Sequence, residues 1–146
     1  MPAKDLKLSD FLCFAVYSAN LAFGRAYRPI LDKLDLTYTQ YVTLVALWER
    51  DGQTVGELGE KLFLESNTLT PILKKLEAIG YVERRRDPSD ERQVRISLTA
   101  KGKQLRVDGI GGNLKDATGL GEDFAKVQQD IVRLRDNLLA FTAARD

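Results

Sequence analysis

Residues 62–102, LFLESNTLTPILKKLEAIGYVERRRDPSDERQVRISLTAKG, decide the fold, because the spacing of their apolar residues changes once along the run. The first part has helical spacing, at Leu69, Ile72, Leu73, Leu76 and Ile79. This spacing predicts an amphipathic helix that ends at Gly80. Further on, Val94, Ile96 and Leu98 alternate with polar residues, which is typical of a half-buried strand.

The strand-like part predicts a β-hairpin. Residues 81–86 and 93–98 flank the segment 87–92, whose proline and aspartates suit a turn. We therefore expect two antiparallel strands joined by a charged tip of six residues, 87–92.

Further helices are expected on either side of this run. One extends from about Tyr38 to Glu49, and Thr54 with Glu57 forms a capping box that opens a short helix to about Leu62. After the hairpin, Thr99 is expected to cap a helix that begins at Ala100. The glycine-bearing stretch 109–113 is interpreted as a helix break.

The two terminal helices carry surplus apolar surface, which either packing within one chain or another subunit could cover. The first, expected after a cap at Ser9, is apolar on more than one side, and Pro29 should kink or break it. The last has an a/d seam at Phe124, Val127, Ile131, Leu134, Leu138 and Phe141. Both helices indicate an intertwined homodimer.

Composition narrows the function. The chain has 146 residues, 44% of them hydrophobic, which fits one domain. It has no histidine and one cysteine, which excludes a His-based zinc site, a Ser-His or Cys-His pair and an internal disulfide. We expect no metal, no cofactor and no catalytic residues. The longest apolar stretch, 11–17, has seven residues, so we expect no membrane span and a cytoplasmic protein.

Charge is concentrated in the middle third. Residues 74–106 contain 10 Lys/Arg and 5 Asp/Glu, whereas the whole chain has a net charge of only +1. The predicted elements follow the order of a winged helix-turn-helix: a helix, a short helix, an amphipathic helix with a polar outer face, and a basic hairpin. This order, with the basic charge, favours double-stranded DNA as partner. A protein-binding winged helix and an unrelated α+β domain stay open at this point.

The same run resembles the MarR family of transcription regulators. The wing pattern D-P-x-D-x-R is present as Asp87, Pro88, Asp90 and Arg92, and the phrase ISLTAKG follows it. The family implies a mainly α fold with a small β-hairpin wing (α+β), a homodimer and a pseudo-palindromic operator. It also implies a recognition helix over 66–79, and a wing whose Arg92 enters the minor groove, oriented by Asp90. The residues expected at DNA are Ser66, Asn67, Thr68, Thr70, Pro71, Lys74, Lys75, Arg86, Asp90 and Arg92.

The resemblance also sets the expected organisation. One MarR-type domain spans residues 1–146. Within it, about 1–34 and 100–146 are dimerisation helices, and about 36–99 are the DNA-binding winged helix.

The N-terminal half resembles one subgroup, the organic-hydroperoxide sensors of OhrR type, and this resemblance gives Cys13 a role. A lone cysteine among apolar residues is usually an inert core residue. In OhrR-type proteins the reactive cysteine is accompanied by two tyrosines of the partner subunit, here Tyr27 and Tyr38. Cys13 should lie in the first helical turn, where the helix N-terminus favours a thiolate. Tyr17 and Tyr41 are expected to be packing residues.

One feature departs from many relatives, which pair the reactive sulfur with a second cysteine. Nothing after Cys13 is a cysteine, so an intersubunit disulfide between different positions is excluded. The chain resembles the one-cysteine branch, in which sulfenic acid is trapped by a small thiol or oxidised further.

We therefore expect a repressor that leaves its operator when an organic hydroperoxide oxidises Cys13. The alternative is a MarR-type repressor that responds to an apolar or phenolic small molecule, with Cys13 inert. A one-cysteine thiol peroxidase is the alternative from another class.

Overall fold

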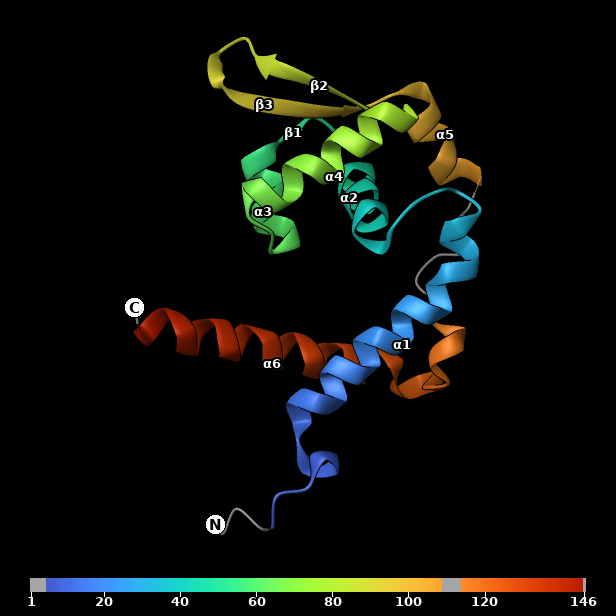
Figure 1. Cartoon of the computed structure of the whole chain (residues 1–146), viewed down its shortest axis with the longest axis vertical. Coiled ribbons are helices and arrows are strands. Elements are labelled where there is room, and N and C mark those ends of the chain that lie inside the picture. Colours follow the sequence, from blue (N-terminus) through green and yellow to red (C-terminus); the bar gives the residue numbers. More distant parts are fainter. Residues whose placement is uncertain (1–4, 109–113, 146) are drawn as a thin grey trace. The chain divides into compact units, whose positions relative to one another are not determined.

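A computed structural model describes residues 5–108 and 114–145 of the chain (Figure 1). The chain divides into two compact units, Met1–Gly111 and Gly112–Asp146. The expectation of a single domain over 1–146 stays a prediction. The glycine-bearing stretch 109–113 lies outside the described residues.

In the first unit, a short 3-10 helix, η2 (Leu8–Asp10), precedes the longer elements. These are α1 (Leu12–Asp32), α2 (Tyr38–Glu49), β1 (Gln53–Thr54), α3 (Val55–Leu62), α4 (Ser66–Ile79), β2 (Val82–Asp87), β3 (Asp90–Leu98) and α5 (Ala100–Asp108). The predicted bounds of α2 and α4 are confirmed, and so is the fold class of a mainly helical chain with a β-hairpin wing. None of the helices within the described ranges combines the length and apolar character needed to cross a membrane.

The sheet is antiparallel and has the strand order β1-β3-β2. β2 and β3 form the predicted hairpin, with Val82 opposite Leu98 and Arg84 opposite Ile96. β1, which the sequence analysis missed, pairs Gln53 with Ile96 and Thr54 with Arg95. The hairpin is therefore anchored on its β3 side before it extends beyond the helices (Figure 1).

The core of this unit lies between α2, α3, α4 and the base of the sheet. Its fully buried side chains are Leu44, Leu47, Leu58, Leu69, Leu73, Leu76, Ile96, Val82 and Thr43. Capping boxes fix the start of two of the helices, because the Thr37 and Thr54 hydroxyls accept the N–H groups of Gln40 and Glu57. The Thr54 box was predicted and is confirmed.

The expected cap of the first helix is wrong, and so is a break at Pro29, whereas a kink at Pro29 stays a prediction. Ser9 lies in η2 and does not cap α1; the cap residue is Phe11, which makes no side-chain capping bond. Pro29 does not break the helix, since α1 continues to Asp32. Pro29 removes one backbone hydrogen bond, but burial of Tyr27 and Leu31 on either side of it holds the last turns in place.

The expected six-residue hairpin tip is also wrong. The strands extend to Asp87 and Asp90, which pair with each other, so only Pro88 and Ser89 form the turn. The Asp87 carboxylate accepts the Ser89 N–H at 2.8 Å, which lets this short turn form directly after the strand.

The second unit contains two 3-10 helices, η3 (Asp116–Thr118) and η4 (Gly121–Asp123), followed by α6 (Phe124–Arg145). The last helix is confirmed. Its residues are half-buried or exposed, and Ile131, Leu138 and Phe141 of the predicted seam are exposed in the single chain.

Gly102 lets α5 approach the start of the hairpin. A Cβ atom on Gly102 would lie 2.2 Å from the Tyr81 carbonyl oxygen. The predicted Thr99 cap is confirmed, since its hydroxyl accepts the Gly102 N–H at 3.1 Å. In addition, the Trp48 indole donates to the Gly102 carbonyl at 2.9 Å. Gly102 thus joins α2, α5 and the hairpin.

We expect Gly102→Ala to lower the free energy of unfolding by about 1–3 kcal/mol, because the clash is with backbone and one side must shift. The control is Gly56→Ala in α3, where the added Cβ meets only the Thr54 hydroxyl at 3.9 Å. That variant should be neutral or more stable by about 0.5–1 kcal/mol. Urea denaturation measures both, and equal stabilities of the two variants would contradict the close approach at Gly102.

Candidate functional site

The recognition helix, α4, has one buried and one exposed face. Leu69, Leu73 and Leu76 are fully buried, which fixes the rotation of the helix about its axis. The predicted DNA-contacting residues of α4 lie on the other faces, and all except half-buried Thr70 are exposed: Ser66, Asn67, Thr68, Pro71, Lys74 and Lys75. The Thr70 hydroxyl donates to the Ser66 carbonyl at 2.7 Å, so its oxygen still has a lone pair to accept from a ligand. The helix continues through Pro71, which is its sixth residue.

The hairpin is held against α4 and β1 by two carboxylates. Glu77 of α4 accepts the Arg84 backbone N–H and its side-chain Nε, both at 3.2 Å. Asp87, which is buried, accepts Arg95 Nε at 2.8 Å, and Arg95 also donates to the Gly52 carbonyl at 2.8 Å. The Ser89 N–H, and then Arg95, hold the pKa of Asp87 below its ordinary value. These bonds join β2 to α4, and they join β3 to β2 and to the segment before β1.

The tip of the wing presents an arginine held by its neighbour. Arg92 donates from Nε to Asp90 Oδ1 at 3.1 Å and from Nη2 to Oδ2 at 3.4 Å. Its side chain is nevertheless 91% exposed. Arg86 donates to the Glu91 carbonyl at 2.8 Å. Both arginines are tied to the hairpin while their charge faces solvent.

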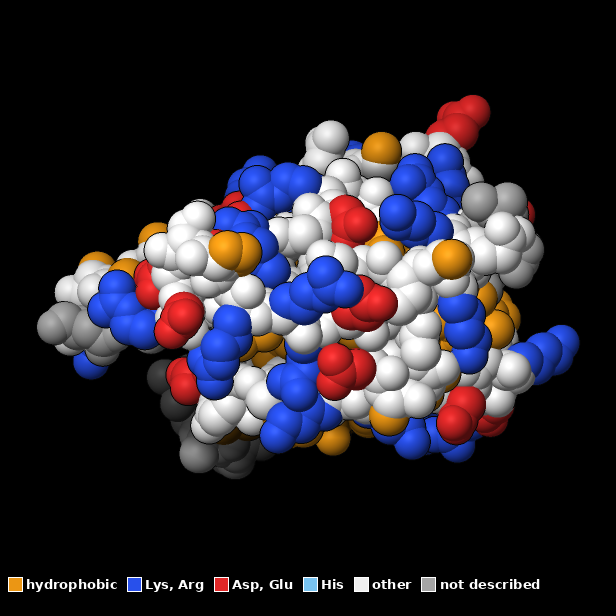
Figure 2. Space-filling view, turned by 90° about the horizontal axis from the view of Figure 1, so that it is seen from above, with side chains coloured by type: hydrophobic (Ala, Val, Ile, Leu, Met, Phe, Trp, Pro, Cys, Tyr) orange, Lys and Arg blue, Asp and Glu red, His pale blue; other side chains and the backbone are white. Residues whose placement is uncertain are grey.

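Positive charge lies on the face of the protein that carries the hairpin (Figure 2). Figure 2, seen from the hairpin side, shows Lys and Arg side chains spread over it with acidic side chains between them. Exposed Lys74 and Lys75 of α4 and Arg85 and Arg92 of the hairpin are among the cations of the basic segment 74–106. An exposed helix beside a basic hairpin suits a groove of double-stranded DNA and the phosphates that flank the groove.

Cys13 is the second residue of α1, so the expectation that it lies in the first turn is confirmed. It is exposed in the single chain, as are its apolar neighbours Phe11, Leu12 and Phe14. In this chain alone Cys13 is therefore not a core residue.

Tyr27 and Tyr38 belong to an aromatic cluster at the other end of α1. Their ring centroids are 5.2 Å apart, and Tyr41 lies 5.6 Å from Tyr27. Burial, followed by the neighbouring Tyr41 and Tyr38, raises the pKa of Tyr27 to about 12, so its phenol stays protonated at neutral pH. Tyr41 is buried as expected, whereas Tyr17 is 58% exposed, so its packing role is not met within one chain.

Within one chain Cys13 and Tyr27 cannot meet. Both lie on α1, 14 residues apart, which is about 21 Å of helix at 1.5 Å per residue. The structure thus brings Tyr27 and Tyr38 together and leaves Cys13 apart from them.

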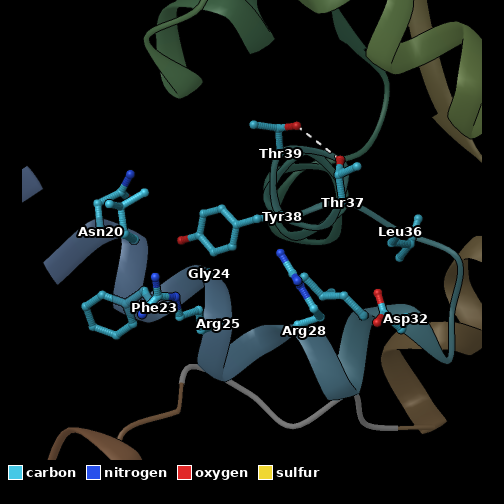
Figure 3. A pocket seen from close by; sticks show the side chains of 12 residues that line it. Asn20, Phe23, Gly24, Arg25, Arg28, Asp32, Leu36, Thr37, Tyr38 and Thr39 are labelled. Atoms are coloured by element: carbon cyan, nitrogen blue, oxygen red, sulfur yellow. Dashed lines mark hydrogen bonds between the residues drawn. The ribbon is translucent and has the colours of Figure 1, made fainter. Parts of the chain in front are cut away.

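A pocket of about 920 Å³ opens between α1 and the start of α2 (Figure 3). Tyr38 reaches into it from α2, and Figure 3 shows its phenol pointing toward Asn20 and Phe23. The other lining residues include Leu21, Gly24, Arg25, Arg28, Leu31, Asp32, Leu36, Thr37 and Thr39. The sequence analysis did not predict this pocket.

These features define a winged-helix DNA-binding protein. Residues 25–108 match the family model described as transcriptional regulator SarA/Rot. The chain belongs to this family of MarR-like winged-helix transcriptional regulators, and the predicted MarR resemblance is confirmed.

Two curated relatives are similar over most of the chain. The HTH-type transcriptional regulator TtmR of Methylorubrum extorquens (strain PA1) is 49% identical over 136 residues, covering 91% of this chain and 70% of that protein. The organic hydroperoxide resistance transcriptional regulator of Bacillus subtilis (strain 168) is 41% identical over 136 residues, covering 91% of this chain and 92% of that protein.

The chain is also similar to a solved structure, reduced AbfR bound to DNA. The TM-score is 0.79 at 34% identity, with 95% of this chain and 99% of that chain covered. AbfR is a protein of Staphylococcus epidermidis.

Sequence reasoning missed the residues that join elements through tertiary contacts. Arg95 of the basic hairpin donates hydrogen bonds to Asp87 and to the Gly52 carbonyl. Gly52 lies just before β1, a strand of two residues that is too short to show an alternating sequence pattern. Arg25 and Arg28 of the pocket had no signal beyond their position on the polar side of the first helix.

Proposed function

We propose that the protein is a homodimeric repressor that binds a pseudo-palindromic operator when reduced and leaves it when an organic hydroperoxide oxidises Cys13. The observation that carries the proposal is the arrangement along α1. An exposed cysteine stands in its first turn, and Tyr27 lies about 21 Å further along the helix, with the tilted ring of Tyr38 of α2 beside it. The relative from Bacillus subtilis, named for organic hydroperoxide resistance, supports the choice of effector. Since operator DNA lies in the cytoplasm, we propose that the protein works there.

A second copy of the chain supplies what one copy lacks. α1 exposes apolar side chains that a monomer would leave in water, among them Leu12 at 61% and Leu21 at 45%. Ile131 and Leu138 of α6 are exposed as well. Apolar surface of this extent is typical of an interface. In an antiparallel pairing of two α1 helices, Cys13 of one chain approaches Tyr27 and Tyr38 of the partner subunit.

We expect Ile131→Asp/Leu134→Asp to give monomers or aggregates, because two carboxylates would be placed in the apolar seam. The matched control is Gln129→Asp/Arg133→Asp, which adds the same carboxylates on the opposite face of α6 at 3.6 residues per turn. Sedimentation at micromolar concentration measures the mass. A wild-type monomer, or an intact dimer of the seam variant, would refute the role of α6.

At DNA, α4 is proposed to enter the major groove and the wing to reach the minor groove. Ser66, Asn67, Thr68 and Thr70 would contact base edges or phosphates, with Pro71 packed beside them. Lys74, Lys75 and Arg86 would neutralise phosphates. Arg92, held by Asp90, would insert its guanidinium in the minor groove. The half-sites should lie about one helical turn apart, roughly 10–10.5 base pairs.

We expect Arg92→Ala to weaken operator binding strongly and to reduce the slope of log affinity against log salt by about 1, since one phosphate-neutralising cation is lost. Arg133→Ala in α6 removes the same charge outside the winged helix and should leave both quantities unchanged. Fluorescence anisotropy at several salt concentrations measures them. An unaltered slope for Arg92→Ala would remove the wing tip from the interface.

The oxidation step needs only the cysteine and the peroxide. The thiolate sulfur attacks the peroxide oxygen that carries hydrogen; an S–O bond forms and the O–O bond breaks. The leaving alkoxide takes a proton from water or a phenol and becomes an alcohol, while the sulfur, oxidised by two electrons, becomes a sulfenic acid. Tyr27 and Tyr38 of the partner subunit are proposed to donate hydrogen bonds to the thiolate, since a phenol is protonated at neutral pH.

The sulfenic acid has no second cysteine to react with. A small thiol converts it to a mixed disulfide with loss of water, or more peroxide oxidises it to a sulfinate. For AbfR, an overoxidised form has been solved bound to DNA, which favours the mixed disulfide over the higher oxides as the form of this protein that leaves DNA.

We expect Cys13→Ser to bind the operator normally and to ignore organic hydroperoxide. Tyr27→Phe and Tyr38→Phe should each slow oxidation of Cys13 by roughly tenfold or more, because each removes a hydrogen bond to a charged sulfur. Tyr81→Phe, whose phenol lies outside the cluster, is the control. Stopped-flow thiol titration and DNA release measure these effects. Peroxide consumption should stop near one equivalent per cysteine, whereas turnover with reductant would indicate a thiol peroxidase.

The pocket beside Tyr38 favours one second candidate, a repressor that responds to an apolar or phenolic ligand with Cys13 inert. The test is whether the Cys13→Ser protein leaves DNA when such a ligand, or a hydroperoxide, is added. Release by both would favour the ligand-responsive repressor over the redox sensor.

A further inference from the structure

The hairpin is bonded to the recognition helix through one carboxylate, that of Glu77. β2 is the outer strand in the order β1-β3-β2, so in the described sheet no further strand covers its far edge. Glu77 of α4 accepts the Arg84 backbone N–H through Oε2 and the Arg84 Nε through Oε1, both at 3.2 Å. These bonds, the backbone one first, hold the pKa of Glu77 below its ordinary value. The backbone of β2 itself, and not only a long side chain, is thus bonded to α4.

Glu77 lies on the same stripe of α4 as residues that we propose to contact DNA. Thr70, Lys74 and Glu77 follow one another at intervals of four and three residues, which places them on one face of the helix. A carboxylate on that face is repelled by DNA phosphates unless a cation offsets its charge. Arg84 supplies that cation from the hairpin. The place of this acid in a basic segment is therefore explained by the wing and not by DNA.

The outer part of the hairpin acts as a lever on these bonds. Among the described residues, Arg84 of β2 and Arg95 of β3 are the last before the tip to hydrogen-bond outside the hairpin, Arg95 to the Gly52 carbonyl. The strand from Arg84 to Asp87 spans about 10 Å. A rotation of about 10° at Arg84 would move the turn by about 2 Å, against a minor groove about 6 Å wide.

We propose that Glu77 is a positioning residue, which sets the wing relative to α4 so that Arg92 reaches the minor groove while α4 occupies the major groove. This inference rests on the proposed function and adds that the two DNA contacts are coupled through one side chain. Arg92 itself is bonded to Asp90 and not to Glu77. The affinity that Arg92 contributes should nevertheless depend on Glu77.

The test is a double-mutant cycle on DNA affinity, measured by fluorescence anisotropy with the reduced, full-length protein. The probe is a duplex of about 30 base pairs that the wild-type protein selects from a random library, long enough for two half-sites and their flanks. In the wild-type background Arg92→Ala should lower the affinity by about tenfold or more. In the Glu77→Ala background it should lower the affinity by about twofold or less, because the wing no longer holds Arg92 at the groove.

Two controls separate positioning from charge and from stability. Glu83→Ala removes a carboxylate from β2 that pairs with Arg85 of the same strand, so it should leave the full Arg92→Ala penalty. Asn67→Ala tests α4 itself, and its effect on affinity should be the same with and without Glu77→Ala. A variant that is merely less stable would lose both dependences together.

A second variant covers a failure of Glu77→Ala to fold. Glu77→Gln keeps the shape of the side chain and one acceptor oxygen but removes the charge. The Arg92→Ala penalty in this background should lie between the penalties expected for wild type and for Glu77→Ala. A penalty equal to that in wild type would count against the positioning role.

A full Arg92→Ala penalty in Glu77→Ala, or an equal loss of the penalty in Glu83→Ala, would overturn the positioning role and leave the wing at the DNA. The absence of any Arg92→Ala penalty in the wild-type background would instead overturn the minor-groove contact of the proposed function. The two failures are therefore distinguishable.

Discussion

The length of α1 is the constraint on which the proposed sensing site depends. Cys13 and Tyr27 lie on one continuous helix, about 21 Å apart, and no bending of an α-helix brings its two ends into contact. A site that contains both the sulfur and the phenols must therefore be built from two chains. The same helix exposes the apolar residues that such a pairing would cover. The pairing that would bury this apolar surface is therefore also the one that would complete the proposed site. A monomer would have neither a covered α1 nor a complete site.

α2 connects the Tyr27 and Tyr38 cluster to the winged helix. Tyr38 begins this helix, Tyr41 lies 6.5 Å from it, and Trp48 lies 6.4 Å from Tyr41. The Trp48 indole donates a hydrogen bond to the carbonyl of Gly102. Nearby, the Thr99 hydroxyl donates a hydrogen bond to the carbonyl of Gly80, which caps the end of α4. Ring contacts and hydrogen bonds therefore form a continuous path from Tyr38 to the end of α4.

Local signals in the sequence predicted the elements that depend on periodicity and capping. α2 and α4 were predicted with their bounds because their apolar stripes stop at clear signals, Glu49 before the turn at Gly52 and Ile79 before Gly80. The features that were missed depend on distant partners. β1 is two residues long, and the hairpin turn is shortened by the Asp87 contact with Ser89. The Arg25 and Arg28 pocket arises where α2 folds back on α1, which no periodicity records.

The protonation of the phenols also separates the oxidised states of Cys13 in the proposed dimer. A phenol is protonated at physiological pH, so the Tyr27 hydroxyl can donate a hydrogen bond to an acceptor of the partner subunit. A thiolate, a sulfinate and a sulfonate all carry negative charge and accept this bond, so those oxides conserve the interaction. A mixed disulfide is neutral, weak as an acceptor and larger by the whole small thiol. In the proposed dimer a mixed disulfide would therefore remove this hydrogen bond and add volume beside α1.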